Sequence, residues 1–565
     1  MKHTRAKLRL VHKLLLAHIV VLLLVQFFVR IHNPMALPAF VDEGSHLARA
    51  QVVYKENPVE TSHGKLLFYF WLGLFSPGEY NALVIGRWAV ALFSLIGSAA
   101  MAAVARQLFG RQAMLPALAF YALAPYTVFF ERMALADSFA GALATLVVWQ
   151  SIRLARRPTG GRGVVLGLLV ALAPMAKLTT SLIVFVPLLA ILLFTAGGKP
   201  HPPPHRREGK EAVRRLSFYR MERRGRLKVA WGEVNRLWKH YHRALIVAAL
   251  VCGIVWLPVL GTALWLRVVE HRDAILIDTY LVNTEQETSA LLQRLADVIT
   301  TSFTLLSEAM TLALVGFAMQ LLWKRPVKAI LVLGWLVLIW GPNILLVREI
   351  QPRYLMAGLP ALAVIFGGGV AVGLEALVRV LRPLAWIGVP RRTVASIGIA
   401  SIMSAWMVTY AFPFAYYASH DPVQLRLTEK DTYNYFTGMY NGWGISLALD
   451  FLNHQGEQIN DQIPVVAVMR NCGVYALHIT SYFDGRCMDW HSFDEDEIAH
   501  NIALWTPLLE SIQEWPFVYV ITEYLPLDAP PTDDSLHWEL VDHFERPHGG
   551  LRTVSIWRVT PVGPV

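Results

Sequence analysis

The sequence predicts a polytopic α-helical membrane protein that carries an extracytoplasmic α/β domain at its C-terminal end. Of its 565 residues, 55% are hydrophobic and only 16% are charged, whereas soluble domains carry about 25% charged residues. Apolar stretches of roughly 20 residues, long enough to cross a bilayer as helices, occur about eleven times before residue 418. After that point acidic residues become frequent and no run is long enough to span. We therefore expect residues 1–418 to form a membrane domain and residues 419–565 a domain outside it.

The predicted spans follow one another closely along the membrane domain. By residue number they centre on Val21, Ser94, Ala119, Leu146, Leu168, Val186, Val251, Leu314, Leu336, Ile365 and Ser404. The first span follows a basic start, as the core of a signal peptide does. No small-x-small cleavage site follows it closely and many further spans do, so we interpret it as a membrane anchor.

Lysine and arginine predict the orientation, because short loops rich in them stay cytoplasmic. The N-terminus is basic from Lys2 to Lys13, and every second loop after it is basic as well. The segment 199–243 is the most basic, with 14 Lys or Arg against 4 acids. We expect a multi-pass protein of the cell membrane, plasma or inner, with a cytoplasmic N-terminus. Its basic face would contact membrane lipids, and no nucleic acid is expected as a partner.

The C-terminal 145 or so residues are enough to bury a core of their own, and their pattern alternates strands with helices. The expected strands and helix are Val465–Val468, Phe517–Thr522, a final hairpin in which Gly549 and Gly550 turn into Thr553–Val559, and the helical run Ser446–Leu452. A small α/β domain is the simplest account of these segments.

Two of the three cysteines, Cys472 and Cys487, fall in the outside domain, where oxidation can occur. A disulfide between them and two free thiols are both compatible with the sequence, which does not give the separation of their Cα atoms. Cys252 lies in a predicted span. No Cys/His spacing in the chain is typical of a zinc site.

A cleft on the outer face is expected from four outer loops, residues 32–80, 131–137, 266–297 and 347–354. In the first loop one helical face carries Leu47, Ala50, Val53 and Tyr54, which we expect to lie along the membrane interface. The run Leu66–Leu74 is apolar but too short to span. The loop 266–297 is either a solvated linker or a lid that orders over a substrate.

Acidic residues mark two of these loops. Asp42 and Glu43 stand side by side just after the first span, and Asp137 begins the fourth span. An Asp at the start of a helix is favoured by capping and by the helix dipole, so Asp137 alone has a structural explanation. Together the two clusters are a plausible floor for the cleft.

Several cations share the predicted outer face, against the bias that keeps positive charge inside. They are His63, Lys65, Arg132, Lys177 and Arg353. A single interfacial Lys or Arg is often a snorkelling anchor. Several of them beside carboxylates indicate instead a site for a phosphate headgroup.

In chain order, the runs VDEGSHLARA, HGKLLFYFWL, ERMALADSF, LAPMAKLTT and PRYLMAGLPALA resemble the GT-C membrane glycosyltransferases. The most similar branch is that of the protein O-mannosyltransferases and lipid A aminoarabinose transferases. The resemblance covers roughly residues 10–420, and the stretch GWGISLALDFLN resembles the extra outside domain of some bacterial members. One departure is that His63, Gly64 and Lys65 stand where the family has a Lys/His-Pro-Pro element, which leaves the transfer of a role to Lys65 open.

The resemblance implies transfer of a sugar from a polyprenyl-phosphate donor to a protein, lipid or glycan acceptor on the outer face. An acceptor hydroxyl is a poor nucleophile, so a carboxylate must take its proton; Asp42 is the candidate base, with Glu43 beside it. The implied phosphate-binding cations are Lys65, His63, Arg353, Lys177 and Arg132. Asp137 would orient the acceptor, assist Asp42, or hold a divalent cation together with Asp42, the one cofactor that the site would take. A single base and direct displacement predict inversion at the anomeric carbon.

Two other classes of protein were weighed. A transporter or flippase of glycolipids places ionisable residues at the bilayer midplane and often shows repeated halves, and neither feature is evident here. No GxxxxGK[ST] loop for ATP occurs either. A scaffold that uses its spans only as an anchor would need far fewer of them.

Overall fold

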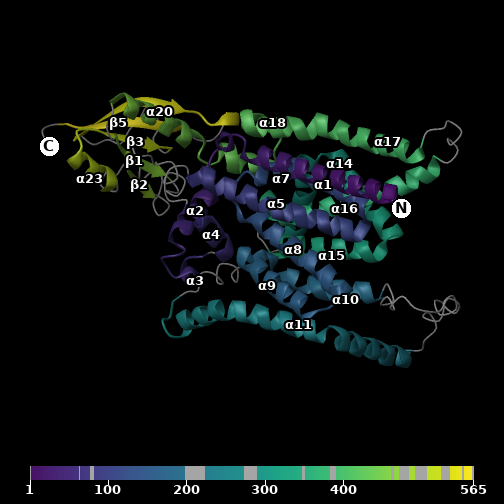
Figure 1. Cartoon of the computed structure of the whole chain (residues 1–565). Coiled ribbons are helices and arrows are strands. Elements are labelled where there is room, and N and C mark those ends of the chain that lie inside the picture. The colour runs from purple at the N-terminus through teal and green to yellow at the C-terminus, as the bar shows by residue number, and fades with distance from the viewer. Residues whose placement is uncertain are drawn as a thin grey trace.

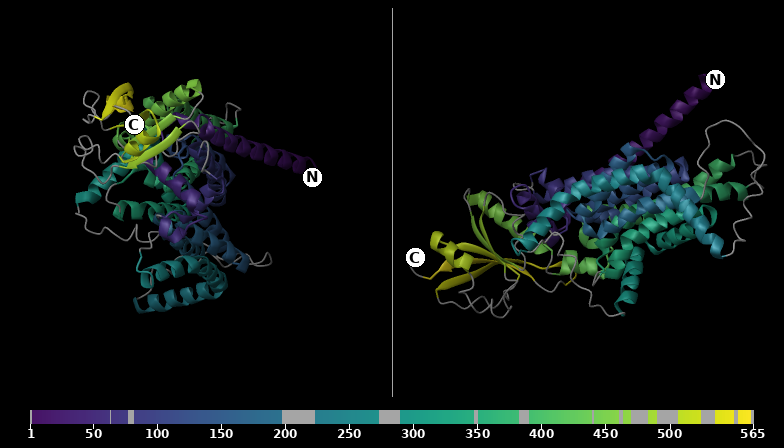
Figure 2. Two further views of the ribbon diagram at one scale, coloured as in Figure 1. Left: turned by 90° about the vertical axis from the view of Figure 1, so that its left-hand side faces the viewer. Right: turned by 90° about the horizontal axis from the view of Figure 1, so that it is seen from below.

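The computed structural model is a long bundle of helices with a small sheet at one end (Figure 1). It describes residues 2–62, 64–76, 82–196, 223–272, 289–346, 350–381, 390–438, 441–459, 463–469, 483–489, 506–523, 535–549 and 553–562. The N-terminus lies at the end of the bundle opposite the sheet, and the other views agree (Figure 2). We call the two ends the sheet end and the N-terminal end.

The bundle is built from the apolar runs that the sequence shows. Its helices are α1 (Lys2–Ile31), α5 (Ala82–Phe109), α6 (Arg111–Leu123), α7 (Pro125–Phe130), α8 (Ala136–Arg156), α9 (Gly160–Ala176), α10 (Val186–Ala196), α11 (Arg223–Val268), α13 (Ser289–Leu306), α14 (Glu308–Lys324), α15 (Pro326–Leu346), α16 (Leu359–Val380), α17 (Arg391–Trp406) and α18 (Phe412–His420). Each predicted span centre lies in one of them or at its first residue, so the predicted fold class is confirmed.

Within the described residues, eight helices are long and apolar enough to cross a membrane, and a ninth is added if α13 and α14, bent by 113°, form one span. This number is lower than the prediction because α9 has 17 residues and α6 only 13. Between α5 and α6, Gly110 has a φ of 94°, in the left-handed region that glycine adopts without strain. The chain therefore reverses there within one residue.

Small residues let the helices approach closely, as is common in membrane bundles. A Cβ atom on Gly141 of α8 would lie 2.9 Å from the Cα of Ala357 in the short helix η4 (Pro352–Gly358). A Cβ on Gly167 of α9 would collide with the carbonyl oxygen of Ala248 in α11. The first of these contacts places the helix that carries Asp137 directly against the segment that carries Arg353.

Three short helices follow α1 at the sheet end, namely α2 (Val41–Val52), α3 (Pro58–Thr61) and α4 (Leu66–Gly73). The expectation that the apolar face of α2 lies along the membrane interface is wrong. Leu47, Ala50 and Val53 are buried inside the protein, where α2 packs on α4 and α5, and only Tyr54 is exposed. An apolar face that contacts protein has the same sequence pattern as one that contacts lipid.

The C-terminal domain is a five-stranded mixed sheet in the order β2-β1-β3-β5-β4. Its strands are β1 (Ile463–Met469), β2 (Phe483–Asp489), β3 (Val518–Thr522), β4 (Leu536–Phe544) and β5 (Val554–Pro561), and its helices are α20 (Trp443–Ile459) and α23 (Thr506–Glu514). β1 is parallel to β2 and β3, whereas β5 is antiparallel to β3 and β4. The predicted strands, hairpin and helix are confirmed; β2 was not predicted, because its sequence FDGRCMD is polar and contains glycine.

The sheet domain is attached to the start of α2. Phe40 and Asn441 form an isolated antiparallel bridge, and the Gly442 N–H donates to the Ala39 carbonyl over 2.7 Å. The Phe40 ring also lies 4.8 Å from the ring of Tyr435. The backbone that begins α2 is thus held between the bundle and the C-terminal domain.

Of the cysteines, Cys487 in β2 is in a disulfide, and Cys252 in α11 is free. Cys472, the predicted partner of Cys487, lies outside the described residues. So do residues 273–288, most of the predicted lid, and residues 197–222, the first half of the basic segment.

Candidate active site

A cavity of about 110 Å³ lies at the sheet end of the bundle, where the predicted outer loops meet. Its lining comes from α2, from the chain just before α4, from the start of α8, from the segment after α9, from α15 and from η4. The lining residues are Asp42, His46, Lys65, Asp137, Lys177, Thr179, Asn343, Arg353 and Tyr354. Five residues that the sequence singled out, spread over more than 300 positions, therefore share one cavity.

Asp42 lies in the first turn of α2 and is the most accessible acid of the cavity, with 32% of its side chain exposed. Its Oδ2 is 2.9 Å from Nη1 of Arg353. Burial alone would raise the pKa of Asp42, but the cations Arg353 and Lys65 outweigh burial and hold the pKa well below its usual range. Asp42 is thus ionised and faces positive charge.

His46 stands one helical turn after Asp42 and is neutral. Its Nδ1 is 2.9 Å from the carbonyl oxygen of Ala134, so Nδ1 carries the proton and donates it. Nε2 is then an acceptor, and it lies 2.8 Å from Nζ of Lys65. Burial, followed by the charge of Lys65, keeps the pKa of His46 well below its ordinary value. A neutral imidazole in this tautomer orients the lysine ammonium.

Lys65 precedes α4 and is partly buried in the site. Burial lowers its pKa to about 8, although Asp42 opposes the shift. The lysine is therefore protonated at neutral pH but loses its proton more readily than an exposed lysine does.

Asp137 and Lys177 form the second ion pair of the cavity, with Nζ of Lys177 2.5 Å from Oδ1 of Asp137 and both side chains less than 10% exposed. Asp137 starts α8, and Lys177 ends α9. The Lys177 ammonium also lies 4.7 Å from the centre of the Tyr354 ring, a cation–π contact. This pair is more buried than the pair of Asp42 and Arg353.

The charges of the cavity do not balance. Three cations, Lys65, Lys177 and Arg353, face two carboxylates, Asp42 and Asp137, and His46 adds no charge. One net positive charge remains in a poorly solvated space, where an anion would be stabilised.

Glu43 faces away from the cavity. Arg87 of α5 binds both of its carboxylate oxygens, at 2.8 and 2.7 Å. The backbone N–H groups of Phe40 and Ala134 donate to the same oxygens, at 3.0 and 2.7 Å. Glu43 is completely buried and its acceptor sites are occupied, so it has no contact with the cavity where a reaction could occur.

The structure places Arg132 elsewhere as well. Its guanidinium donates to the carbonyl oxygens of Val29 and Asn33, at 2.6 and 2.8 Å, and to Ser419 Oγ at 3.0 Å. Arg132 thereby ties the end of α1 to the end of α18 and does not line the cavity. His63, the remaining predicted phosphate ligand, lies outside the described residues.

Four lining residues were not singled out from the sequence, namely His46, Thr179, Asn343 and Tyr354. His46 could have been found, because residues four apart share one face of a helix and His46 follows Asp42 at that spacing. Tyr354 follows Arg353 directly. Asn343 and Thr179 are single polar residues in apolar segments and carry no comparable signal.

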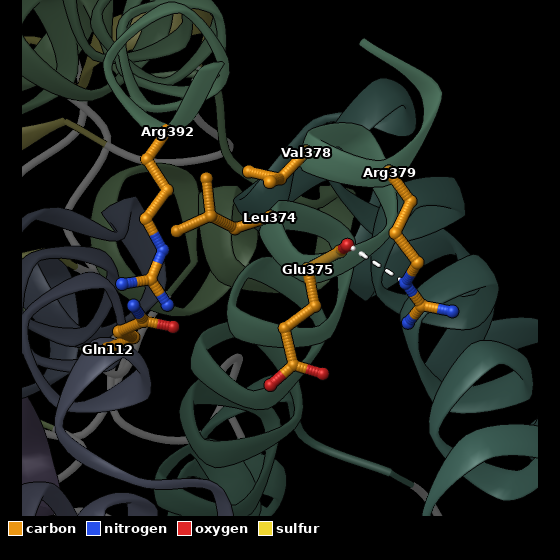
Figure 3. A pocket seen from close by; sticks show the side chains of 6 residues that line it. All are labelled: Gln112, Leu374, Glu375, Val378, Arg379 and Arg392. Carbon is orange, nitrogen blue, oxygen red and sulfur yellow. Dashed lines mark hydrogen bonds between the residues drawn. The ribbon is translucent and has the colours of Figure 1, made fainter. Parts of the chain in front are cut away.

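A second cavity, of about 280 Å³, lies at the N-terminal end (Figure 3). Its lining residues are Gln112, Leu374, Glu375, Val378, Arg379 and Arg392. It lies near the end of α16 far from Arg353, and α16 is about 33 Å long. Glu375 is the one acid in its lining and is 3.6 Å from Arg325. Two facing carboxylates occur only in the first of these cavities.

No group of three or more His, Cys, Asp or Glu side chains in the described part of the chain is arranged to hold a metal ion. Asp42 and Asp137, the two acids considered for a divalent cation, are each paired with a cation of the protein.

A protein family and several solved structures are similar to this chain. Residues 70–202 match the family of dolichyl-phosphate-mannose-protein mannosyltransferases. No curated protein sequence matches the chain. Among solved structures, ArnT from Cupriavidus metallidurans bound to undecaprenyl phosphate is similar with a TM-score of 0.51 and 14% identity, over 96% of this chain and 97% of that one.

The chain shares the fold of ArnT from Cupriavidus metallidurans. The predicted resemblance to the GT-C glycosyltransferases is confirmed by the family match and by the likeness to ArnT, which extends over both domains of the chain. A further similar structure is the oligosaccharyltransferase of Archaeoglobus fulgidus in complex with Zn and sulfate, with a TM-score of 0.46 and 11% identity over 95% of this chain and 72% of that one.

Proposed function

We propose that this protein transfers a sugar from a polyprenyl-phosphate-linked donor to an acceptor hydroxyl at the outer face of the membrane. The N-terminal end would face the cytoplasm, and residues 419–565 would cover the site from outside. The observation that carries the proposal is the cavity itself, in which an ionised carboxylate, Asp42, is held at 2.9 Å by a cation suited to bind phosphate, Arg353.

The charge of the cavity matches the charge of such a donor. A sugar linked to a polyprenyl chain through one phosphate is a phosphodiester with a single negative charge. The cavity has one net positive charge, so binding would neutralise it. We assign the phosphate to Lys65 and Arg353, because a guanidinium and an ammonium both bind phosphate oxygens well.

Phosphate binding would also activate Asp42. The donor phosphate competes with Asp42 for Arg353, and its negative charge raises the pKa of the Asp42 carboxylate. Asp42 would thus gain basicity only when a donor is present. The coupling explains how a carboxylate with so low a pKa can serve as a base.

The reaction then balances with the residues at hand. The acceptor oxygen bonds to the anomeric carbon as its proton passes to Asp42, and the bond from that carbon to the phosphate oxygen breaks. Polyprenyl phosphate leaves with the bonding electrons, and Lys65 and Arg353 stabilise the added charge. A phosphate is a stable anion, so no strong general acid is required.

We infer inversion at the anomeric carbon. Retention would need a second carboxylate free to attack the sugar, and Asp137 is bound to Lys177 at 2.5 Å. The role that fits Asp137 is to position Lys177 and the acceptor. Analysis of the product by NMR should show the opposite anomeric configuration from that of the donor, and a retained configuration would exclude direct displacement.

Glu43 and Arg132 receive positioning roles in this proposal. Glu43 fixes α2 to α5 through Arg87, which directs Asp42 into the cavity. Arg132 fixes the chain that enters and leaves the bundle at the sheet end. Neither contacts the bound donor.

A panel of polyprenyl-phosphate sugars tests the proposal. Purified protein in lipid would be given each donor together with a membrane extract as the source of acceptor, and release of polyprenyl phosphate would be followed. Turnover of at least one donor is expected. If every donor stays intact and a vesicle assay shows that a donor crosses the bilayer, the protein is a glycolipid flippase. That is the alternative function that the sequence left open.

A further inference from the structure

The carboxamide of Asn343 belongs to the cavity lining and has one polar atom without a hydrogen-bond partner among the described residues. Asn343 lies near the end of α15 and is 2% exposed. Its Nδ2 donates to the carbonyl oxygens of Ile339, at 3.0 Å, and Tyr354, at 3.4 Å. Its Oδ1 is buried and accepts no hydrogen bond from any described residue.

The two carbonyl groups fix the orientation of this amide. A rotated carboxamide would place Oδ1 against the carbonyl oxygens of Ile339 and Tyr354, and acceptors repel one another. Oδ1 must therefore remain the free atom. A buried acceptor without a donor is unfavourable, so the site gains when a ligand supplies that donor.

We propose that Asn343 Oδ1 accepts a hydrogen bond from a hydroxyl group of the donor sugar, and that Asn343 is a specificity-determining residue. This inference rests on the proposed function. A phosphodiester has no hydrogen-bond donor and would be repelled by Oδ1, which leaves the phosphate to Lys65 and Arg353. A sugar hydroxyl is the part of the same substrate that has a proton to donate.

The chemistry of the surrounding lining agrees with this assignment. Thr179 and Tyr354 line the cavity together with Asn343, and a hydroxyl and an aromatic ring are both suited to a sugar. Four charged groups of the same lining are already paired, Asp42 with Arg353 and Asp137 with Lys177, and Lys65 is assigned to the phosphate. The neutral Oδ1 can therefore select for a hydroxyl at one position of the sugar ring.

The test compares donors that lack one hydroxyl each, for wild type and for Asn343→Leu, which has a similar volume but no acceptor. For wild type, one deoxy donor should lose about 10–100-fold in kcat/KM relative to the parent donor. For Asn343→Leu that same deoxy donor and the parent should differ by less than about 3-fold. A merely structural role for Asn343 would lower the rates of all donors together and leave their ratio unchanged.

Two controls distinguish a change in sugar specificity from a loss of folding. Polyprenyl phosphate without a sugar should bind Asn343→Leu as tightly as it binds wild type, which shows an intact fold and phosphate site. If that variant does not fold, Asn343→Ala is used in the same comparison. The inference is overturned if wild type distinguishes none of the deoxy donors, or if the variant discriminates as wild type does. Failure of wild type to cleave even the parent donor would overturn the proposed function as well.

Discussion

Asp42 and Glu43 are neighbours in sequence but belong to different structures. Asp42 Oδ2 is 2.9 Å from Arg353 at the edge of the cavity, whereas Glu43 Oε2 is 2.7 Å from Arg87 in the interior of the bundle. Successive residues of an α-helix point about 100° apart, so one turn of α2 can present a carboxylate to a ligand and anchor itself with the next. Loss of the charge of Glu43 should therefore lower the stability of the protein, whereas loss of the charge of Asp42 should lower its activity.

Glu43→Gln should destabilise the protein. It removes the negative charge that compensates Arg87 in a completely buried pair, and loss of one partner of such a pair typically costs about 3–5 kcal/mol. Thermal unfolding in detergent should show a clear fall in Tm. Asp42→Asn is the matched control. Because Asp42 is partly exposed, the Tm of this variant should stay near that of wild type. Equal Tm values for Glu43→Gln and wild type would contradict the anchoring role.

The activity should fall above about pH 8. Burial lowers the pKa of Lys65 to about 8, so the ammonium that binds phosphate is present below that pH and is lost as the pH rises through it. A profile of kcat/KM from pH 6.5 to 9.5 should show this limb for wild type. Lys65→Arg keeps its charge throughout the range, and any activity that it retains should lack the limb. The same limb in both proteins would assign it to another group.

Asp137 and Lys177 should be strongly coupled. Either Asp137→Asn or Lys177→Met leaves one buried charge without a partner, at a cost of about 3–5 kcal/mol, and the double variant should recover much of that loss. The free energy of unfolding of the four proteins gives the coupling. The pair of the exposed Arg272 and the partly buried Glu60 serves as a control, with an expected coupling below about 1 kcal/mol. Additive effects at Asp137 and Lys177 would show that the pair is not formed.

Asp431 should make the protein less stable as the pH rises. It lies in the short helix α19 (Glu429–Thr432), and burial raises its pKa from 3.8 to about 7. The folded state therefore holds a proton that the unfolded chain releases, so the contribution of Asp431 to stability is greatest below pH 4 and falls until about pH 7. The Tm of Asp431→Asn relative to wild type should rise from pH 5 to pH 8. A difference that does not depend on pH would contradict the raised pKa.

Much of the membrane domain could be predicted because hydrophobic length is a local property of the sequence. Every predicted span centre coincides with a helix, and Asp42, Lys65, Asp137, Lys177 and Arg353 were chosen because they are charged residues of the predicted outer face. Their positions around one cavity are observed, and their roles stay predictions. The face of α2 was assigned wrongly because lipid and protein interiors are equally apolar.

Other features depend on partners that are distant in sequence. Arg87, which distinguishes Glu43 from Asp42, is 44 residues away from it. Arg132 was expected at the phosphate because it is a cation on the predicted outer face, but its partners Val29 and Ser419 lie in other helices. Strand β2 is polar and is defined by its pairing with β1, which no local pattern indicates.

We propose that Asp42 becomes the base when the donor binds. Single-turnover kinetics with Asp42→Asn test this role most directly. A donor that wild type cleaves would be bound to each protein, and transfer to the acceptor would be timed after mixing. The variant should bind the donor at least as tightly as wild type, because Arg353 is no longer shared, yet transfer the sugar about 10²–10⁴-fold more slowly. Transfer at the wild-type rate by Asp42→Asn would contradict the assignment of Asp42 as the base.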